Sequence, residues 1–130
     1  MLDPMYRVPV RLTPATTDYM KGITDIVGML TYERGTLRLE CKPESYILPS
    51  TLSTVEFQLA DLFEVQFSKK WGTSTLGIQP RRMSVLDGIP GAHTDALILK
   101  VKRKDRNAAA NLASKVNLDL SEWRLEQLDG

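Results

Sequence analysis

Apolar and polar residues alternate along several stretches of the chain, and this period of two predicts short β-strands. Glu33-Arg34-Gly35 divides one stretch into a hairpin, because glycine supplies the positive φ of a short loop. Pro9 cannot donate a ladder hydrogen bond, so we expect the first strand to lie at a sheet edge. The predicted strands lie in Tyr6–Leu12, Met29–Cys41, Val55–Leu59, Phe63–Phe67, Thr73–Gln79, Met83–Leu86 and Ala96–Lys102.

Near the end of the chain the period changes to that of an amphipathic helix. The last predicted strand leads through Arg103-Lys104 to Asp105, which is placed to accept hydrogen bonds from the first turn of a helix. Small and apolar residues then recur at helical spacing on one narrow face as far as Asn117. They are Ala109, Leu112, Ala113 and Val116. We expect this helix to cover a curved sheet of short strands.

The segment Leu118–Leu128 that follows is unusually apolar. Asp119 and Glu122 have the spacing of a capping box, which predicts a second short helix. Apolar side chains are costly to leave in water, so the segment either packs onto the sheet or meets a partner. The predicted partner-binding residues are Leu118, Leu120, Trp123, Leu125 and Leu128.

Length and composition favour one globular domain. The chain has 130 residues, 42% of them hydrophobic and 25% charged, and we divide it into an N-terminal extension at 1–22, a core at 23–117 and an apolar tail at 118–130. The net charge is only +1, so an anionic partner must be met by a local patch. Met1–Tyr6 lacks the basic and apolar regions of a signal peptide, and we expect a cytoplasmic protein.

Short antiparallel strands that end in one strand and a closing helix resemble the bacterial pleckstrin-homology-like domains. The likeness covers about Ile23–Asn117 and is carried by the hairpin Gly28–Glu40, by Val55–Val65 and above all by Ala96–Val116. It implies a bent antiparallel barrel or sandwich of about seven strands with a C-terminal helix, and a binding function. Members that bind phosphoinositides carry a lysine and a spaced basic pair on the first hairpin.

In this chain the matching hairpin offers Arg34 and Arg38 beside Glu33 and Glu40, and so departs from that basic pattern.

Two basic groups are candidate anion-binding or lipid-binding sites. Lysine and arginine beside a tryptophan suit a phosphate-rich surface, because the cations meet the charge and the aromatic ring inserts at the interface. Solvent-facing charge on a strand and its loops is the simpler interpretation of the same residues. One group is Lys100, Lys102, Arg103 and Lys104, with Arg106 at the start of the predicted helix, and the other is Lys69, Lys70 and Trp71 with Arg81 and Arg82.

Catalytic chemistry has little support in the sequence. Cys41 is in phase with Leu37 and Leu39, which predicts a small core residue, and His93 lies in a loop rich in proline and glycine. No run of histidine, cysteine and carboxylate has metal-ligand spacing, and no phosphate-binding glycine motif is present. We expect no catalytic residue, metal or cofactor.

We therefore expect a non-enzymatic module that binds protein, with self-association as one form of that binding. The alternative is a peripheral binder of anionic phospholipid head groups through the basic loops. Neither a nucleic acid nor a small-molecule substrate is expected as a partner.

Overall fold

The computed structural model describes residues 5–12, 23–45, 52–81 and 97–129. Within these ranges the chain forms a mainly β fold with one long C-terminal helix, which confirms the predicted fold class. Short 3₁₀ turns, η1 (Leu59–Asp61) and η3 (Arg103–Asp105), precede β5 and the helix α2 (Arg106–Asp129). The strands are β1 (Tyr6–Leu12), β2 (Ile23–Glu33), β3 (Thr36–Ser45), β4 (Ser53–Gln58), β5 (Leu62–Ser68), β6 (Ser74–Pro80) and β7 (Leu97–Val101).

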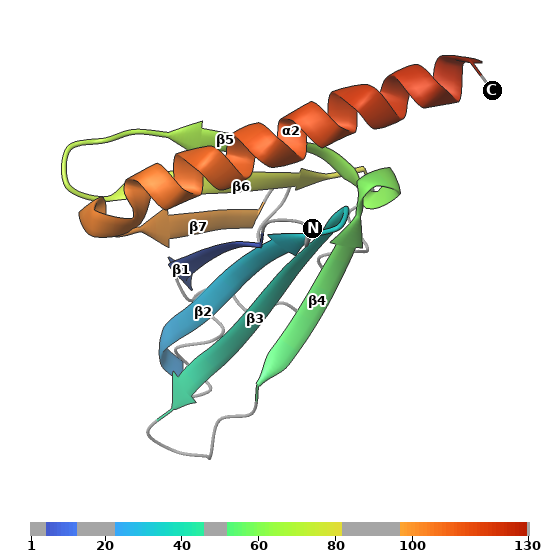
Figure 1. Ribbon diagram of the computed structural model, residues 1–130. Coiled ribbons are helices and arrows are strands. Elements are labelled where there is room, and N and C mark those ends of the chain that lie inside the picture. Colours follow the sequence, from blue (N-terminus) through green and yellow to red (C-terminus); the bar gives the residue numbers. More distant parts are fainter. Residues whose placement is uncertain (1–4, 13–22, 46–51, 82–96, 130) are drawn as a thin grey trace.

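The strands form one antiparallel sheet in the order β4-β3-β2-β1-β7-β6-β5, curled into a half-barrel (Figure 1). The predicted edge position of the first strand is wrong, because β1 lies in the middle, between β2 and β7. β1 pairs with β2 along its whole length, but its only paired residues with β7 are Arg11 and Lys100. Because β1 has so little ladder pairing on its β7 side, the missing amide hydrogen of Pro9 costs the sheet few hydrogen bonds, and the strand can lie inside it.

The β2–β3 hairpin has the turn that the sequence predicts. Glu33 pairs with Thr36, which leaves Arg34 and Gly35 as a two-residue loop with φ of 51° and 76°. Positive φ at both loop positions matches the twist of the flanking strands. The strands continue well beyond the predicted Met29–Cys41, from Ile23 to Ser45.

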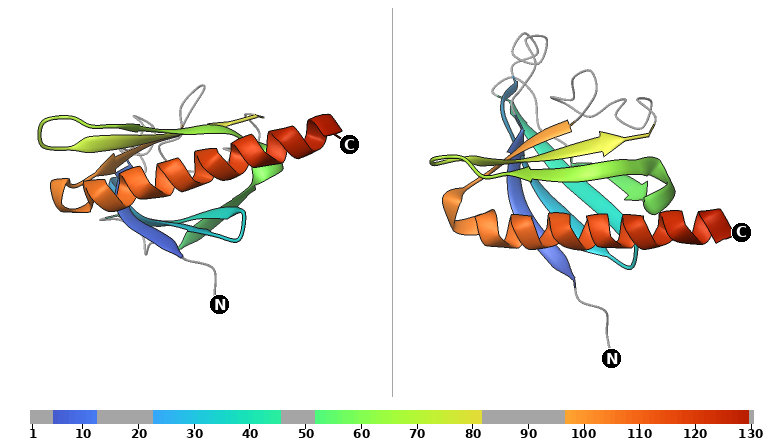
Figure 2. Two further views of the ribbon diagram at one scale, coloured as in Figure 1. Left: turned by 45° about the horizontal axis from the view of Figure 1, so that its top comes forward. Right: turned by 90° about the horizontal axis from the view of Figure 1, so that it is seen from above.

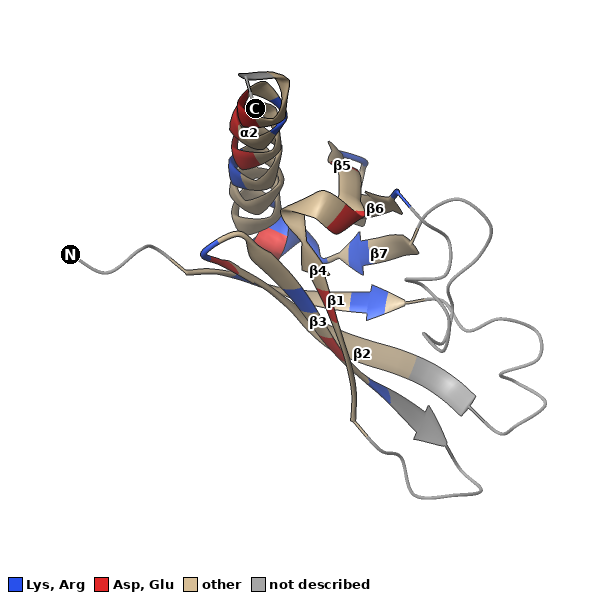
Figure 3. Cartoon of the chain, turned by 90° about the vertical axis from the view of Figure 1, so that its right-hand side faces the viewer, with Lys and Arg blue, Asp and Glu red and all other residues tan. Residues whose placement is uncertain are grey.

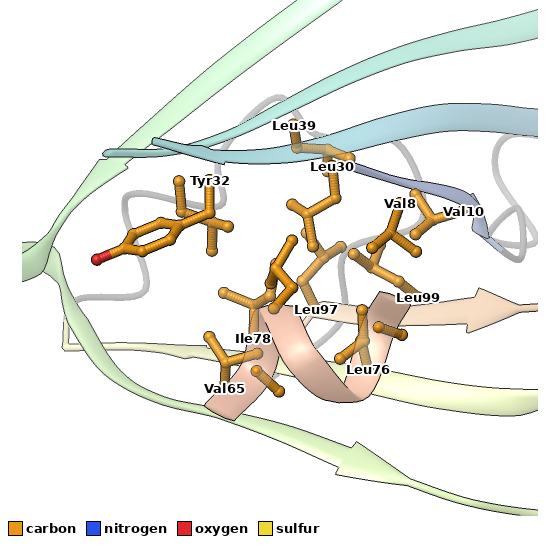
Figure 4. Close-up of a cluster of buried hydrophobic side chains, with 14 of the residues drawn as sticks. Val8, Val10, Leu30, Tyr32, Leu39, Val65, Leu76, Ile78, Leu97 and Leu99 are labelled. Atoms are coloured by element: carbon orange, nitrogen blue, oxygen red, sulfur yellow. The ribbon is translucent and has the colours of Figure 1, made fainter. Parts of the chain in front are cut away.

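Alternate residues of the strands point into the half-barrel, where α2 lies across them (Figures 2 and 4). The predicted helix face is confirmed: Ala109, Leu112, Ala113 and Val116 are all buried. The small alanines let the helix lie close to the sheet. The strand side chains of the core include Val8, Leu30, Tyr32, Phe57, Leu76, Ile78 and Leu99.

The helix does not stop where the sequence predicts. Instead of a second short helix after Asn117, α2 continues unbroken to Asp129, because no glycine or proline occurs in this segment. Asp119 is not a cap: its carboxylate accepts a 2.5 Å hydrogen bond from the Tyr32 hydroxyl and pairs with Lys115 at 3.0 Å. These contacts attach the middle of α2 to β2.

Asp105 precedes the helix, but its carboxylate oxygen Oδ2 does not accept the capping hydrogen bond that the sequence predicts. That oxygen is buried and has no hydrogen-bond partner among the described residues. The chain enters α2 through η3, in which the Asp105 amide donates to the Lys102 carbonyl at 2.9 Å.

Side chains of α2 cover the outer edge of β5. The Val65 amide donates to Oδ1 of Asn117 at 3.1 Å, and Nδ2 of Asn117 donates to the Val65 carbonyl at 2.7 Å. Arg124 donates to the Phe63 carbonyl and lies 5.4 Å from the centre of the Phe63 ring. The side-chain amide thus takes the place of a neighbouring strand, and edges covered in this way resist pairing with other chains.

Candidate functional site

Two segments far apart in the sequence form a pocket at one end of the half-barrel. The β5–β6 loop contributes Lys69, Lys70, Trp71 and Gly72, and the turn into α2 contributes Arg103 and Arg106. The pocket has a volume of about 390 Å³, and no acidic residue is among the described residues that line it. We call this pocket, with its four cations and one tryptophan, the basic notch; its two segments meet at the left end of α2 in Figure 1.

Trp71 is fully exposed at the end of the β5–β6 loop. The loop is closed by a 3.4 Å hydrogen bond from the Lys70 amide to the hydroxyl of buried Ser74, and Gly72 supplies a φ of 85°. A large aromatic side chain without cover is unfavourable in water, whereas its ring is suited to a membrane interface. The loop therefore holds an amphipathic side chain between cations.

A second pocket of about 180 Å³ lies beside β1 and β7. It is lined by the basic residues Arg11, Lys100, Lys102 and Lys104, and by Asp105. We call it the β1–β7 pocket. Among the described residues, eight basic side chains and one acidic side chain line the two pockets. A chain of almost no net charge thus concentrates positive charge at one end.

The predicted basic group of Lys69, Lys70, Trp71, Arg81 and Arg82 does not form one cluster in the structure. Arg81 lies at the far end of β6 from Lys69 and Lys70, about 20 Å along a seven-residue strand. Its Nε donates to the Leu62 carbonyl at 3.0 Å, and its guanidinium lies 5.1 Å from the centre of the Trp123 ring. Arg81 therefore contacts the helix and is no part of the basic notch. Arg82 lies outside the described residues.

The predicted partner-binding residues also divide, into buried and exposed groups. Leu120 is 1% exposed and belongs to the core, and Trp123 is half-buried beneath Arg81. Leu118, Leu125 and Leu128 are 54%, 61% and 80% exposed. Leu120 and Trp123 therefore cannot serve as a free binding surface, whereas the three exposed leucines are available to a partner.

Sequence reasoning identified Arg106, whose positive charge opposes the helix dipole in the first turn of α2, but it missed Arg11. Arg11 joins the β1–β7 pocket through the pairing of β1 with β7, which has no local signature.

Other reactive groups give no second site in the described part of the chain. Cys41 is buried, and burial raises the pKa of its thiol, which keeps it unreactive. His93, like the predicted strand Met83–Leu86, lies outside the described residues. The described ranges contain no group of three or more metal-ligating side chains, and no helix within them is long and apolar enough to span a bilayer.

No protein-family model, curated protein or solved structure matches this chain. The likeness to pleckstrin-homology-like domains stays a prediction, carried by the arrangement of strands and helix.

Proposed function

We propose that this chain is a non-enzymatic interaction module that docks its basic notch onto an anionic phospholipid surface. The observation that carries the proposal is Trp71, fully exposed at the end of a loop and flanked by cations from two segments. Tryptophan favours the head-group region of a bilayer, where its ring is buried and its N–H stays hydrated. We retain membership of the pleckstrin-homology-like domains as part of this proposal, on the basis of the fold.

Charge supplies the attraction in this proposal. A basic residue near an anionic leaflet contributes about 1 kcal/mol at physiological ionic strength. The four cations of the basic notch therefore contribute roughly 4 kcal/mol, and the β1–β7 pocket adds to this if it also faces the lipid. Binding of this strength is reversible, and salt weakens it because the charges are exposed.

Vesicle co-sedimentation tests the proposal directly. We expect binding to vesicles that contain phosphatidylglycerol, none to pure phosphatidylcholine, and release by 0.5 M salt. Lys69→Glu with Lys70→Glu removes binding, and Trp71→Ala weakens it. Arg7→Glu with Lys42→Glu is the matched control, because both of these exposed cations lie outside the two pockets. Equal loss in the control pair, or binding without anionic lipid, contradicts the proposal.

A further inference from the structure

The C-terminal end of α2 extends past the sheet as an apolar and acidic surface (Figures 1 and 2). Leu125 and Leu128 are exposed there beside exposed Glu122 and Glu126. Neither glutamate forms an ion pair with a described residue, whereas Arg124, the basic residue among them, is held against Phe63. We call Glu122, Leu125, Glu126 and Leu128 the helix tip; acidic positions are visible on these turns in Figure 3.

The charges of α2 are placed against its own dipole. The first turn has no acidic residue and contains Arg106, and the last turn has no basic residue. Favourable placement is the reverse, with acidic residues at the start of a helix and basic residues at its end. Helix stability therefore does not explain this distribution, which leaves opposite charges at the two ends of one rigid element.

The helix tip complements the basic notch in both charge and polarity. Its two glutamates match a pocket whose charged lining, within the described part of the chain, is Lys69, Lys70, Arg103 and Arg106. Its two exposed leucines match Trp71, the exposed aromatic side chain of that pocket.

The tip cannot reach the notch of its own molecule. Arg106 and Leu128 lie on the same continuous helix, about 33 Å apart at a rise of 1.5 Å per residue. Tyr32 and Asn117 hold the middle of that helix on the sheet. The occupant is therefore the tip of a second copy.

We propose that the helix tip of one molecule docks in the basic notch of the next. One such contact leaves a free notch on one molecule and a free tip on the other, so further copies add head to tail, as chains or as closed rings. The regulatory part of this inference rests on the proposed membrane function, because both use the notch: a tip in the notch excludes the membrane, and anionic lipid releases the tip. Self-association then regulates membrane docking.

Two complementary variants test the contact in the full-length chain. Lys69→Glu with Lys70→Glu removes the notch and keeps the tip, and Leu125→Ser with Leu128→Ser removes the tip and keeps the notch. By sedimentation velocity at low salt, we expect concentration-dependent assembly of the unmodified protein into chains or closed rings. Each variant is expected to associate at least tenfold more weakly. An equimolar mixture is expected to form a one-to-one dimer, because one intact notch meets one intact tip. Leu118→Ser is the control, an exposed leucine of the same helix outside the tip.

The outcomes separate the two proposals. A monomeric unmodified protein, or chains that persist in both variants, overturns the head-to-tail contact even where vesicles are bound. Chains that follow the expected mixing rule in a protein that ignores anionic vesicles support the contact and overturn the membrane function. If both proposals are right, the tip variant binds phosphatidylglycerol vesicles more tightly than the unmodified protein at high protein concentration.

Discussion

Leu120→Ala tests whether the C-terminal half of α2 belongs to the folded core. Leu120 is 1% exposed, whereas Leu118, two residues earlier on the same helix, is 54% exposed. Sequence reasoning placed both in one apolar segment, and the structure assigns them opposite surroundings. The two alanine variants therefore form a matched pair that differs in burial alone.

The size of the effect follows from the packing. Removing a fully buried leucine costs about 2–5 kcal/mol, through lost transfer energy and the cavity left behind. Leu120 is the last buried residue along α2, so neighbouring side chains can partly close the cavity, and we expect about 3 kcal/mol. For a domain of this size that loss lowers the melting temperature by roughly 10 °C. Leu118→Ala is expected to change stability by less than about 0.5 kcal/mol.

Urea unfolding followed by circular dichroism measures both free energies of unfolding. The expected result is a lower midpoint for Leu120→Ala with an unchanged slope, and a curve for Leu118→Ala that overlays the unmodified protein. Equal effects of the two substitutions, or a loss below 1 kcal/mol for Leu120→Ala, would refute the packing of this segment on the sheet.

Three further predictions concern the side chains of Asn117, Tyr32 and Cys41. Asn117→Ala removes both side-chain hydrogen bonds to Val65, at a net cost of about 1 kcal/mol, and is expected to speed hydrogen exchange of the Val65 amide. Burial and the Asp119 carboxylate raise the pKa of the Tyr32 hydroxyl in the folded protein. The contribution of Tyr32 to stability is therefore complete below about pH 10, where the phenol of the unfolded chain begins to ionise, and it is lost as the pH rises further. Tyr32→Phe should flatten that alkaline decline in urea midpoints, and an identical decline would show that Tyr32 does not cause it. Cys41 is expected to react with a thiol reagent only after unfolding, and rapid reaction of the native protein would place it at the surface.

Most of the strands could be predicted from the sequence because half-burial leaves a local signature. Alternation located Tyr6–Leu12 and Val55–Phe67 within a few residues, and it located the hairpin turn, although both hairpin strands are longer than predicted. The position of β1 inside the sheet was predicted wrongly, since pairing with β7 joins residues almost ninety positions apart. A capping pattern at Asp119 was misleading, because Tyr32 and Lys115 hold that carboxylate in the middle of a helix.

The candidate site was visible only in parts. Lys69, Lys70, Trp71 and Arg103 were identified from composition, but their proximity depends on the sheet that places the β5–β6 loop beside the turn into α2. Arg81 was grouped with them because basic residues near one another in sequence resemble a patch. Its contact with Trp123 depends on the packing of the helix, which no local pattern encodes.

The fluorescence of Trp71 tests the central proposal most directly. Trp123→Phe leaves Trp71 as the only tryptophan, and Trp71→Phe leaves the half-buried Trp123 as an internal control. We predict that phosphatidylglycerol vesicles shift the emission of Trp71 to shorter wavelength, that 0.5 M salt reverses the shift, and that Trp123 does not respond. An unchanged Trp71 spectrum with anionic vesicles, or the same shift with phosphatidylcholine alone, would contradict docking through the basic notch.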